Sequence, residues 1–464
     1  MLRAQERRSQ GGDYYIFTWA QNATIVHDEF WENLLAYAEF IGAEVHVIPG
    51  RYRNPSLMYS QGKVERTEWW DDTVLPYLNT NREEIHPGVV FMGDIKIQPT
   101  AVNPMSGLQS FAGDSTAIFG HPKVQLQSMP NLPGHRQAIH LTTGACTVRN
   151  YSDTKAGKKG EHHHMLGFVL LEAPAEGPYH VRQVTATREG SFIDLFWEVN
   201  EGRVTPITEC KAFVMGDIHL AQVEERVVDL TLDYLDRVRP EATVIHDVFD
   251  GVSVNHHEAA NPFSAYARMQ KGNHVLLDEV NAVMEFLRRI LPYRPVLAYS
   301  NHCEWIDRWL ASEDWRKDIV NAATYLRYAH ILLTEQPEGG ILHYLVDEEF
   351  GDEVITLGPN SSMKVGPWEI ANHGHMGVNG SRGGMNGFRK FNTKVIFAHF
   401  HSAARYEGAV QVGTFTRKDM GYNKGPSSWT WCGAVVHTND KVQQLIFTED
   451  EHGRVRYTTL QPGN

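Results

Sequence analysis

The chain has 464 residues, which is enough for two domains of ordinary size, each with its own hydrophobic core. Hydrophobic residues make up 42% and charged residues 21%, as in soluble globular proteins, and no apolar run reaches the length of a membrane span. The 56 acidic and 43 basic residues give a net charge of −13, which argues against a protein that coats nucleic acid nonspecifically.

The expected location is the cytoplasm. The N-terminal segment lacks the apolar stretch of a secretion signal. The four cysteines are widely separated and form no Cys-x-x-Cys pair, which is typical of reduced thiols in a reducing compartment.

Residues 1–205 are expected to form a mixed α/β domain. A strand at 14–17, a helix near 30–41 and a strand at 43–48 come first, and loops rich in Asn, Pro and Gly follow. Later apolar runs such as AIHLTTG and LGFVLLEA predict more strands. The run at 162–164, three histidines after several lysines, is predicted to lie in an exposed loop. No motif in this part indicates a function, so shaping a substrate channel and mediating self-association both stay open.

A second domain is expected over residues 206–464, because Gly, Pro and polar residues accumulate near 200–210. We expect a strand ending at 215, a helix at 224–238, a strand at 242–245, one long helix within 263–290, a strand at 295–299 and helices within 305–329. Beyond residue 353, short apolar segments predict a second sheet. Strands that alternate with helices indicate an α/β fold in which helices cover sheets.

Oxygen and imidazole side chains stand where five hydrophobic runs of this second part end. They are Asp217, His219, Asp247, Asn301, His302, His373, His399 and His401. Ligand-binding crevices form at the carboxyl ends of strands in α/β sheets, so these side chains are expected to meet at one rim.

These residue types suit two divalent ions. A carboxylate such as Asp247 can bridge two cations, and imidazoles and an amide oxygen complete each coordination shell with little added charge. Mn²⁺ is the favoured ion, with Mg²⁺, Fe²⁺ and Zn²⁺ as alternatives. Two such ions can activate water and stabilise both oxygens of a displacement at phosphorus, which favours phosphoester hydrolysis.

The ordered set resembles the calcineurin-like metallophosphoesterases over about residues 211–401. The resemblance implies a β-sandwich flanked by helices. It assigns one metal to Asp217, His219, Asp247 and His401, and the other to Asp247, Asn301, His373 and His399. His302 would face the phosphate as a transition-state stabiliser or acid. The chain departs from the family pattern at His246, where the family usually has Gly, and this ring either reaches the site or only packs.

Further segments, among them DVFDGVSVNHHEAANPF and HGHMGVNGSRGGMNGF, are similar to the tailed-phage metallophosphoesterases known as first-step DNA-transfer nucleases. This closer resemblance implies a DNA substrate and, for a phage-encoded chain, the host cytoplasm. It leaves open whether copies of the chain form a homo-oligomer.

Several other residues are candidates for catalysis or substrate binding. His256 and His257 are candidate proton donors to the leaving oxygen, and the alternative is that they only support a metal ligand or lie on the surface. His375 is a candidate substrate contact. Arg382, Arg389 and Lys390 lie in a Gly-rich basic segment that could hold DNA or be an ordinary solvated loop.

The leading hypothesis is a manganese-dependent deoxyribonuclease. A metal-dependent phosphatase or phosphodiesterase that acts on nucleotides or phosphoproteins shares the same site and is the enzymatic alternative. A binding module that keeps the fold without activity is the third, and it would usually have lost ligands.

Overall fold

The computed structural model describes residues 12–52, 69–132, 134–255, 261–420 and 423–460. Its largest sheet has ten strands in the order β17-β18-β19-β21-β20-β6-β7-β5-β4-β3. These are β3 (Arg82–His86), β4 (Val89–Met92), β5 (Thr116–Phe119), β6 (Gln125–Met129), β7 (Ala138–Thr142), β17 (Lys364–Val365), β18 (Trp368–Glu369), β19 (Lys394–Phe397), β20 (Ala404–Tyr406) and β21 (Ala409–Gln411). Because β20 pairs with β6, strands from both sides of the expected division at residues 205 and 206 share one sheet.

A six-stranded sheet in the order β16-β15-β14-β13-β22-β23 packs on this large sheet. Its parallel strands are β13 (Ala212–Asp217), β14 (Thr243–His246), β15 (Pro295–Ala298) and β16 (Ile355–Leu357), and β22 (Cys432–Val436) and β23 (Val442–Ile446) are antiparallel. Val214 and Val296 of this sheet share a buried cluster with Ile396 and Val410 of the large one. The two sheets therefore form a sandwich.

A four-stranded sheet packs on the other half of the large sheet through a second buried cluster. It comprises β1 (Gly12–Gln21), β2 (Ala43–Gly50), β8 (Gly167–Pro174) and β9 (His180–Thr185). Two smaller sheets comprise β10 (Phe192–Asp194), β11 (Trp197–Asn200) and β12 (Arg203–Pro206), and β24 (Thr448–Glu449) and β25 (Val455–Arg456). The protein is thus mixed α/β with several sheets.

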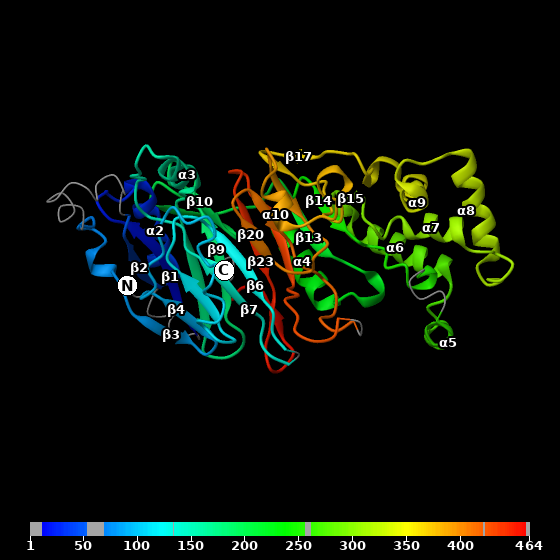
Figure 1. The fold of residues 1–464 in the computed structure, drawn as a ribbon, viewed down its shortest axis with the longest axis horizontal. Helices are drawn as coiled ribbons and strands as arrows, with labels where there is room; N and C mark the ends of the chain where they lie inside the picture. Colours follow the sequence, from blue (N-terminus) through cyan, green and yellow to red (C-terminus); the bar gives the residue numbers. More distant parts are fainter. Residues whose placement is uncertain (1–11, 53–68, 133, 256–260, 421–422, 461–464) are drawn as a thin grey trace.

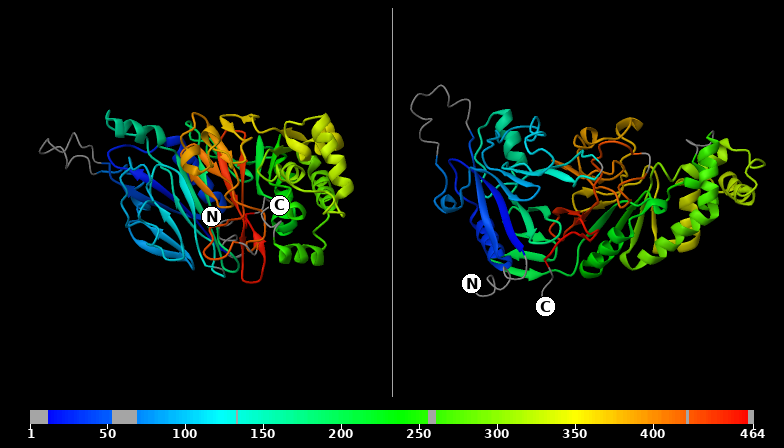
Figure 2. Two further views of the ribbon diagram at one scale, coloured as in Figure 1. Left: turned by 45° about the vertical axis from the view of Figure 1, so that its right-hand side comes forward. Right: turned by 90° about the horizontal axis from the view of Figure 1, so that it is seen from below.

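Helices lie outside the sheets, and α7, α8 and α9 gather at the end of the molecule opposite α2 (Figures 1 and 2). The α-helices are α2 (Asp28–Ile41), α3 (Lys155–His163), α4 (Glu225–Val238), α5 (Pro262–Lys271), α6 (Leu276–Ile290), α7 (Trp305–Ser312), α8 (Ala322–Thr334), α9 (Gly340–Phe350) and α10 (Met385–Phe388). Short 3-10 helices are η3 (Leu75–Tyr77), η4 (Leu220–Gln222), η5 (Val252–Val254), η7 (Leu291–Tyr293), η8 (Gly351–Glu353) and η9 (Val378–Gly380).

Helix α4 shows why these segments become helices that cover a sheet. Val227, Thr231, Tyr234 and Val238 recur every three or four residues and are buried. Such spacing gives an amphipathic helix one apolar face, which here packs in the same cluster as Phe213 of β13. Of the described helices, none is both long and apolar enough to cross a membrane.

Two sequence-based expectations about helices were wrong. The single long helix within 263–290 is two helices, because Gly272 adopts a left-handed conformation and its N–H caps the carbonyls of Arg268 and Met269. The histidines at 162–164 do not lie in an exposed loop. His162 and His163 end helix α3, which begins where the Thr154 hydroxyl accepts a hydrogen bond from the N–H of Gly157.

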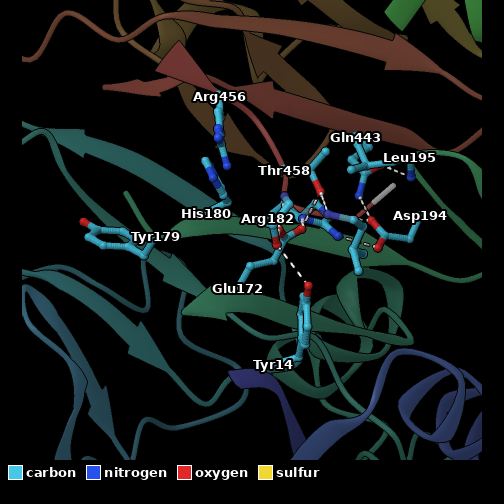
Figure 3. A network of polar contacts seen from close by, with 12 residues as sticks. Tyr14, Glu172, Tyr179, His180, Arg182, Asp194, Leu195, Gln443, Arg456 and Thr458 are labelled. Carbon is cyan, nitrogen blue, oxygen red and sulfur yellow. Dashed lines mark hydrogen bonds and ion pairs between the residues drawn. The ribbon is translucent and has the colours of Figure 1, made fainter. Parts of the chain in front are cut away.

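A buried ionic network connects the N-terminal and C-terminal parts (Figure 3). Arg182 of β9 forms ion pairs with Glu172 of β8 and, at 2.6 Å from its Nε, with Asp194 of β10. Gln443 of β23 donates to Asp194 over 2.8 Å, and Thr458 donates to Glu172 over 2.6 Å. Side chains more than 240 positions apart in the sequence thus share one network.

Candidate metal centre

The predicted ligands lie just beyond the carboxyl ends of neighbouring strands. Asp217 is the last residue of β13, and His219 follows it. Strands β13 and β14 are parallel, and Asp217 pairs with His246. Asp247, the residue after His246, therefore lies at the same end of the sheet as Asp217 and His219. The N–H of His219 donates to the carbonyl of Asp247 over 2.7 Å, which fixes the two loops to each other.

The remaining ligands reach this edge from three further loops. Asn301 follows β15, His373 follows β18, and His399 and His401 follow β19. The N–H of Ala398 donates to the carbonyl of His373 over 2.7 Å, and the N–H of His399 donates to Asp217 Oδ2 over 3.0 Å. Residues from five loops of both sheets of the sandwich therefore converge at one place.

The Asp247 carboxylate lies between two groups of side chains. Its Oδ2 is 3.1 Å from His373 Nε2 and 3.6 Å from His219 Nε2. On one side, His401 Nε2 lies 3.3 Å from His219 Nε2 and 3.2 Å from Asp217 Oδ2. On the other side, His373 Nε2 lies 3.2 Å from Asn301 Oδ1.

His399 belongs to the second group. Ligand atoms of Asp247, His373 and His399 all lie within 4.8 Å of one another, a spacing compatible with a shared metal ion. Burial lowers the pKa of His399 to about 4, so its imidazole is neutral at pH 7 and free to bind a cation.

Four of these residues have a left-handed backbone conformation that non-glycine residues rarely adopt. The φ angles are 44° at His219, 45° at Asp247, 78° at His399 and 59° at His401. Such strain costs energy and clusters at functional sites, where surrounding contacts impose it. The loops therefore hold these side chains in place at a cost in backbone conformational energy.

The donor set fits divalent metal ions. Two nitrogens that bind one tetrahedral ion at ordinary Zn–N distances are about 3.3 Å apart, which matches the His219–His401 separation. In addition, Asp247 Oδ1 is buried and has no hydrogen-bond partner among the described residues. Buried polar atoms normally have a partner, so this pattern supports a site that a cation completes.

The pKa values of the two buried aspartates also support a cation site. Burial raises the pKa of Asp217, but the hydrogen bond and charge of His401 outweigh it and lower the pKa to about 2. A similar balance, dominated by burial and the opposing charge of His373, holds the pKa of Asp247 well below its usual range. Two buried, ionised carboxylates are costly unless cations neutralise them.

Asp250 belongs to the centre, although it was not among the predicted ligands. Its Oδ1 lies 3.3 Å from His219 Nδ1, and Asp250, His219 and His302 form a second group with metal-ligand spacing. Burial lowers the pKa of His219, but the hydrogen bond to Asp250 and the charge of Asp247 raise it to about 9. From the sequence, Asp250 is predicted to be a structural acid or one that orients a ligand imidazole, and not a metal ligand.

His302 sits beside this group with a defined ring orientation. Its Nδ1 lies 2.9 Å from the carbonyl oxygen of Asp250, which can only accept, so Nδ1 carries the proton. The ring stacks on Trp305 at 4.2 Å and meets the His219 ring at 4.7 Å. Nε2 is therefore the ring atom left to contact a substrate.

The other candidate residues occupy different positions. The His375 ring lies 5.4 Å from His373 and 6.1 Å from His399, next to the centre. His246 is fully buried with its ring 5.4 Å from His373, so it packs beneath the centre. His256 and His257 lie outside the described residues.

The predicted basic segment does not present all its cations to the centre. Arg382 is exposed, in a turn that hydrogen-bonds to the backbone of His375 through Gly383. Lys390 is exposed as well. Arg389 instead turns to Asn103, 3.0 Å from its Nη1, and to Glu407, 3.6 Å from its Nη2.

Fold and centre together define a mixed α/β protein with a buried carboxylate and imidazole cluster that is suited to divalent metal ions. The chain is similar to Protein A1 of Escherichia phage T5, with 30% identity over 94% of this chain and 82% of the relative. It belongs to the family of this phage protein. No family model and no solved structure matches the chain.

Proposed function

We propose that this protein is a two-metal-ion phosphodiesterase that hydrolyses DNA, built on a metallophosphoesterase sandwich. The observation that carries the proposal is the position of Asp247, whose Oδ2 lies within 3.6 Å of an imidazole from each of two ligand groups. A carboxylate in this position can bridge two ions. Manganese suits the mixture of carboxylate, amide and imidazole donors.

When bound, two such ions supply the positive charge that favours attack of water on phosphorus and stabilises both oxygens of the displacement. Asp217, His219 and His401 would hold one ion, Asn301, His373 and His399 the other, and Asp247 both. The protein's own contribution is to fix these groups through β13, β14 and β15 and their loops, so that little reorganisation is needed during the reaction.

His302 is the proposed contact to the reacting phosphate. With Nδ1 donating to the Asp250 carbonyl, a protonated Nε2 can donate to a phosphate oxygen or to the departing sugar oxygen. Stacking on Trp305 keeps the ring in this orientation. His375, beside the same centre, is the next candidate for a substrate contact.

Two observations support the proposal that the substrate is DNA and that the protein acts in the host cytoplasm. One is the similarity of the segments around His256 and His373 to phage DNA-transfer nucleases. The other is membership of a phage protein family. Two metal ions can hold a phosphodiester even though the chain carries a net charge of −13.

The test is hydrolysis of a substrate panel with and without Mn²⁺: plasmid DNA, linear duplex, single strand, a cyclic nucleotide and an aryl phosphate. We expect manganese-dependent cleavage of DNA by the wild type. Asp217→Ala should reduce cleavage to background, and His302→Ala should slow it by about 10²- to 10⁴-fold, as for loss of a proton donor.

Asp278→Ala, which removes an exposed carboxylate on α6, serves as the matched control and should cleave at the parental rate. Parental rates for Asp217→Ala or His302→Ala would contradict the proposed site. Hydrolysis of the small phosphoesters without any cleavage of DNA would keep the reaction class and refute the DNA substrate.

A further inference from the structure

A cavity of about 690 Å³ lies away from the metal centre, and no residue of that centre lines it. Its walls come from both parts of the chain: the end of α3 at His162 and His163, the start of β19 at Lys394, β20 at Arg405, and Lys441 just before β23. Arg389 of the predicted basic segment faces this cavity.

The lining is strongly basic. It contains seven Lys and Arg side chains and two carboxylates, Glu407 and Asp440. The cations are Lys123, Arg149, Arg188, Arg389, Lys394, Arg405 and Lys441. In a chain with a net charge of −13, such a concentration of positive charge is a local feature and not a consequence of composition.

The two carboxylates are already engaged. Glu407 Oε1 lies 3.5 Å from Lys123 Nζ, 3.5 Å from His163 Nε2 and 3.6 Å from Arg389 Nη2. Asp440 Oδ1 accepts from Lys211, which is outside the lining, over 2.6 Å. Most of the positive charge of the cavity is therefore not neutralised by its own acids.

Among these cations, Arg405 gives the strongest indication of a bound anion, because it is buried without an acidic partner in the described ranges. Arg405 is 2% exposed, its Nη1 donates to the Val442 carbonyl over 3.1 Å, and its Nε has no hydrogen-bond partner in the part of the chain that the structure describes. Among the described residues it forms no ion pair, and burial lowers its pKa to about 10. An unpaired buried guanidinium is costly, and a bound anion would satisfy it.

Lys441 and Lys394 extend the same positive surface. Burial lowers the pKa of Lys441 to about 8, and the neighbouring charges of Lys394 and Arg405 act in the same direction. Apolar side chains including Phe388, Phe391 and Met165 line other parts of the cavity. The cavity thus offers cations for phosphate and apolar surface for a base or sugar, within the size range of small-ligand sites.

We propose that this cavity binds a nucleotide unit through its phosphate, with Arg405 and Lys441 as the main contacts, at a site separate from the metal centre. Arg and Lys are the side chains that proteins use to hold phosphate. The choice of a nucleotide rests on the proposed function, because the substrate of a deoxyribonuclease and its products are all built of nucleotide units. The source is either a free nucleotide or one unit of a DNA strand.

The test is calorimetric titration of the full chain in EDTA, so that neither cleavage nor the metal centre contributes. The probes are inorganic phosphate, thymidine 5′-monophosphate, thymidine and a single-stranded thymidine 12-mer. We expect the monophosphate to bind and thymidine not to bind. Arg405→Gln and Lys441→Gln should each weaken binding at least tenfold, while Arg316→Gln, on an exposed arginine outside the cavity, should not.

The affinities of the probes distinguish the two sources of the nucleotide. Tighter binding of the 12-mer than of the monophosphate indicates a site for a DNA strand, and the reverse order indicates a site for a free nucleotide. Because Arg405 is buried, its variant is also followed by thermal melting without ligand. A melting temperature at or above that of the wild type is expected if Arg405 serves a ligand, and a marked fall would show a structural role.

Lys441→Gln, which alters a half-buried side chain, keeps the test decisive if the arginine variant does not fold. Absence of binding by any phosphate-bearing probe, or binding that neither variant weakens, would overturn the proposal. Binding of inorganic phosphate alone would overturn the nucleotide assignment. None of these results depends on DNA cleavage, so failure here and failure of the nuclease proposal are distinguishable.

Discussion

At the scale of single residues, the centre depends on side chains that orient other side chains. Asp250 contacts His219 Nδ1 with its carboxylate and His302 Nδ1 with its backbone carbonyl. A carboxylate behind an imidazole fixes the tautomer and the ring orientation and raises the basicity of the coordinating nitrogen. Asp250 is therefore a positioning residue, and its removal should act through His219.

Replacing Asp250 by Ala should weaken Mn²⁺ binding by about 10- to 100-fold, the usual cost of losing such a partner. Asp250→Asn keeps an acceptor oxygen but no charge, so it should have a smaller effect. Calorimetric titration of Mn²⁺ into the metal-free protein measures both, with Asp278→Ala as the control. Wild-type affinity in Asp250→Ala would show that His219 needs no orienting partner.

The candidate ligands could be predicted from sequence because each follows a hydrophobic run, and parallel strands bring their ends to one edge. Asp217 and Asp247 are brought together by the pairing of β13 with β14. The sequence indicates Asp250 as an acid that could orient a ligand imidazole, but it does not show which ligand. The turn of Arg389 toward Glu407 could not be predicted, because it depends on a loop conformation that has no periodic pattern in the sequence.

At the scale of elements, tight loops hold the centre. Gly374, directly after His373, has a φ of 114°, and a Cβ at this position would lie 2.8 Å from the carbonyl oxygen of Ala398. Only glycine tolerates both conditions. The loop after β18 can therefore approach the loop after β19 closely enough for His373 and His399 to share an ion.

Gly374→Ala should lower the free energy of unfolding by about 1–3 kcal/mol, the typical cost of a strained backbone. It should also weaken Mn²⁺ binding, because His373 and His399 must separate. Urea unfolding measures the first effect and calorimetry the second. The control is Gly387→Ala, in α10, where a Cβ meets nothing within 4 Å. Equal stability of the two variants would refute the close approach.

Strands and helices of the second part lie close to where periodicity predicts them, as β14 and α4 show. Helix α9 was not expected, and the break at Gly272 was missed because one glycine can lie inside a helix or cap it. Helix α3 was mistaken for a loop, since its Gly157 and Gly160 are poor helix formers.

At the scale of the whole molecule, the two parts of the chain are joined by the ten-stranded sheet and by the Arg182 network. Burial raises the pKa of Glu172 and of Asp194, but the charge of Arg182 outweighs it and lowers both. Groups with a depressed folded-state pKa stabilise the fold above their unfolded pKa, about 4, and lose this contribution as the pH falls.

Arg182→Met should therefore destabilise the protein at pH 7 by about 3–5 kcal/mol, because two buried carboxylates lose their cation. The stability difference from the wild type should shrink as the pH falls from 7, because burial raises the pKa of the unpaired carboxylates and the variant takes up protons on folding already above pH 4. Below about pH 4 it should shrink further, because the wild type then loses the contribution of its ionised carboxylates. Denaturant unfolding at several pH values measures this. Arg288→Met, at an exposed ion pair with Glu349, should cost less than about 1 kcal/mol. A gap that stays constant with pH would contradict the ionic explanation.

The sequence does not predict that the two parts of the chain share one sheet and one buried ionic network. The composition near residue 205 predicts a division, but Asp194 and Gln443 meet across it, and such long-range pairs leave no local pattern.

The most direct test of the central claim is anomalous X-ray scattering from crystals of the full chain with Mn²⁺. We predict two manganese peaks, roughly 3.5–4 Å apart, on either side of the Asp247 carboxylate. One would contact Asp217, His219 and His401, and the other Asn301, His373 and His399. Bound manganese elsewhere in the molecule, with no peak beside Asp247, would contradict the proposed centre.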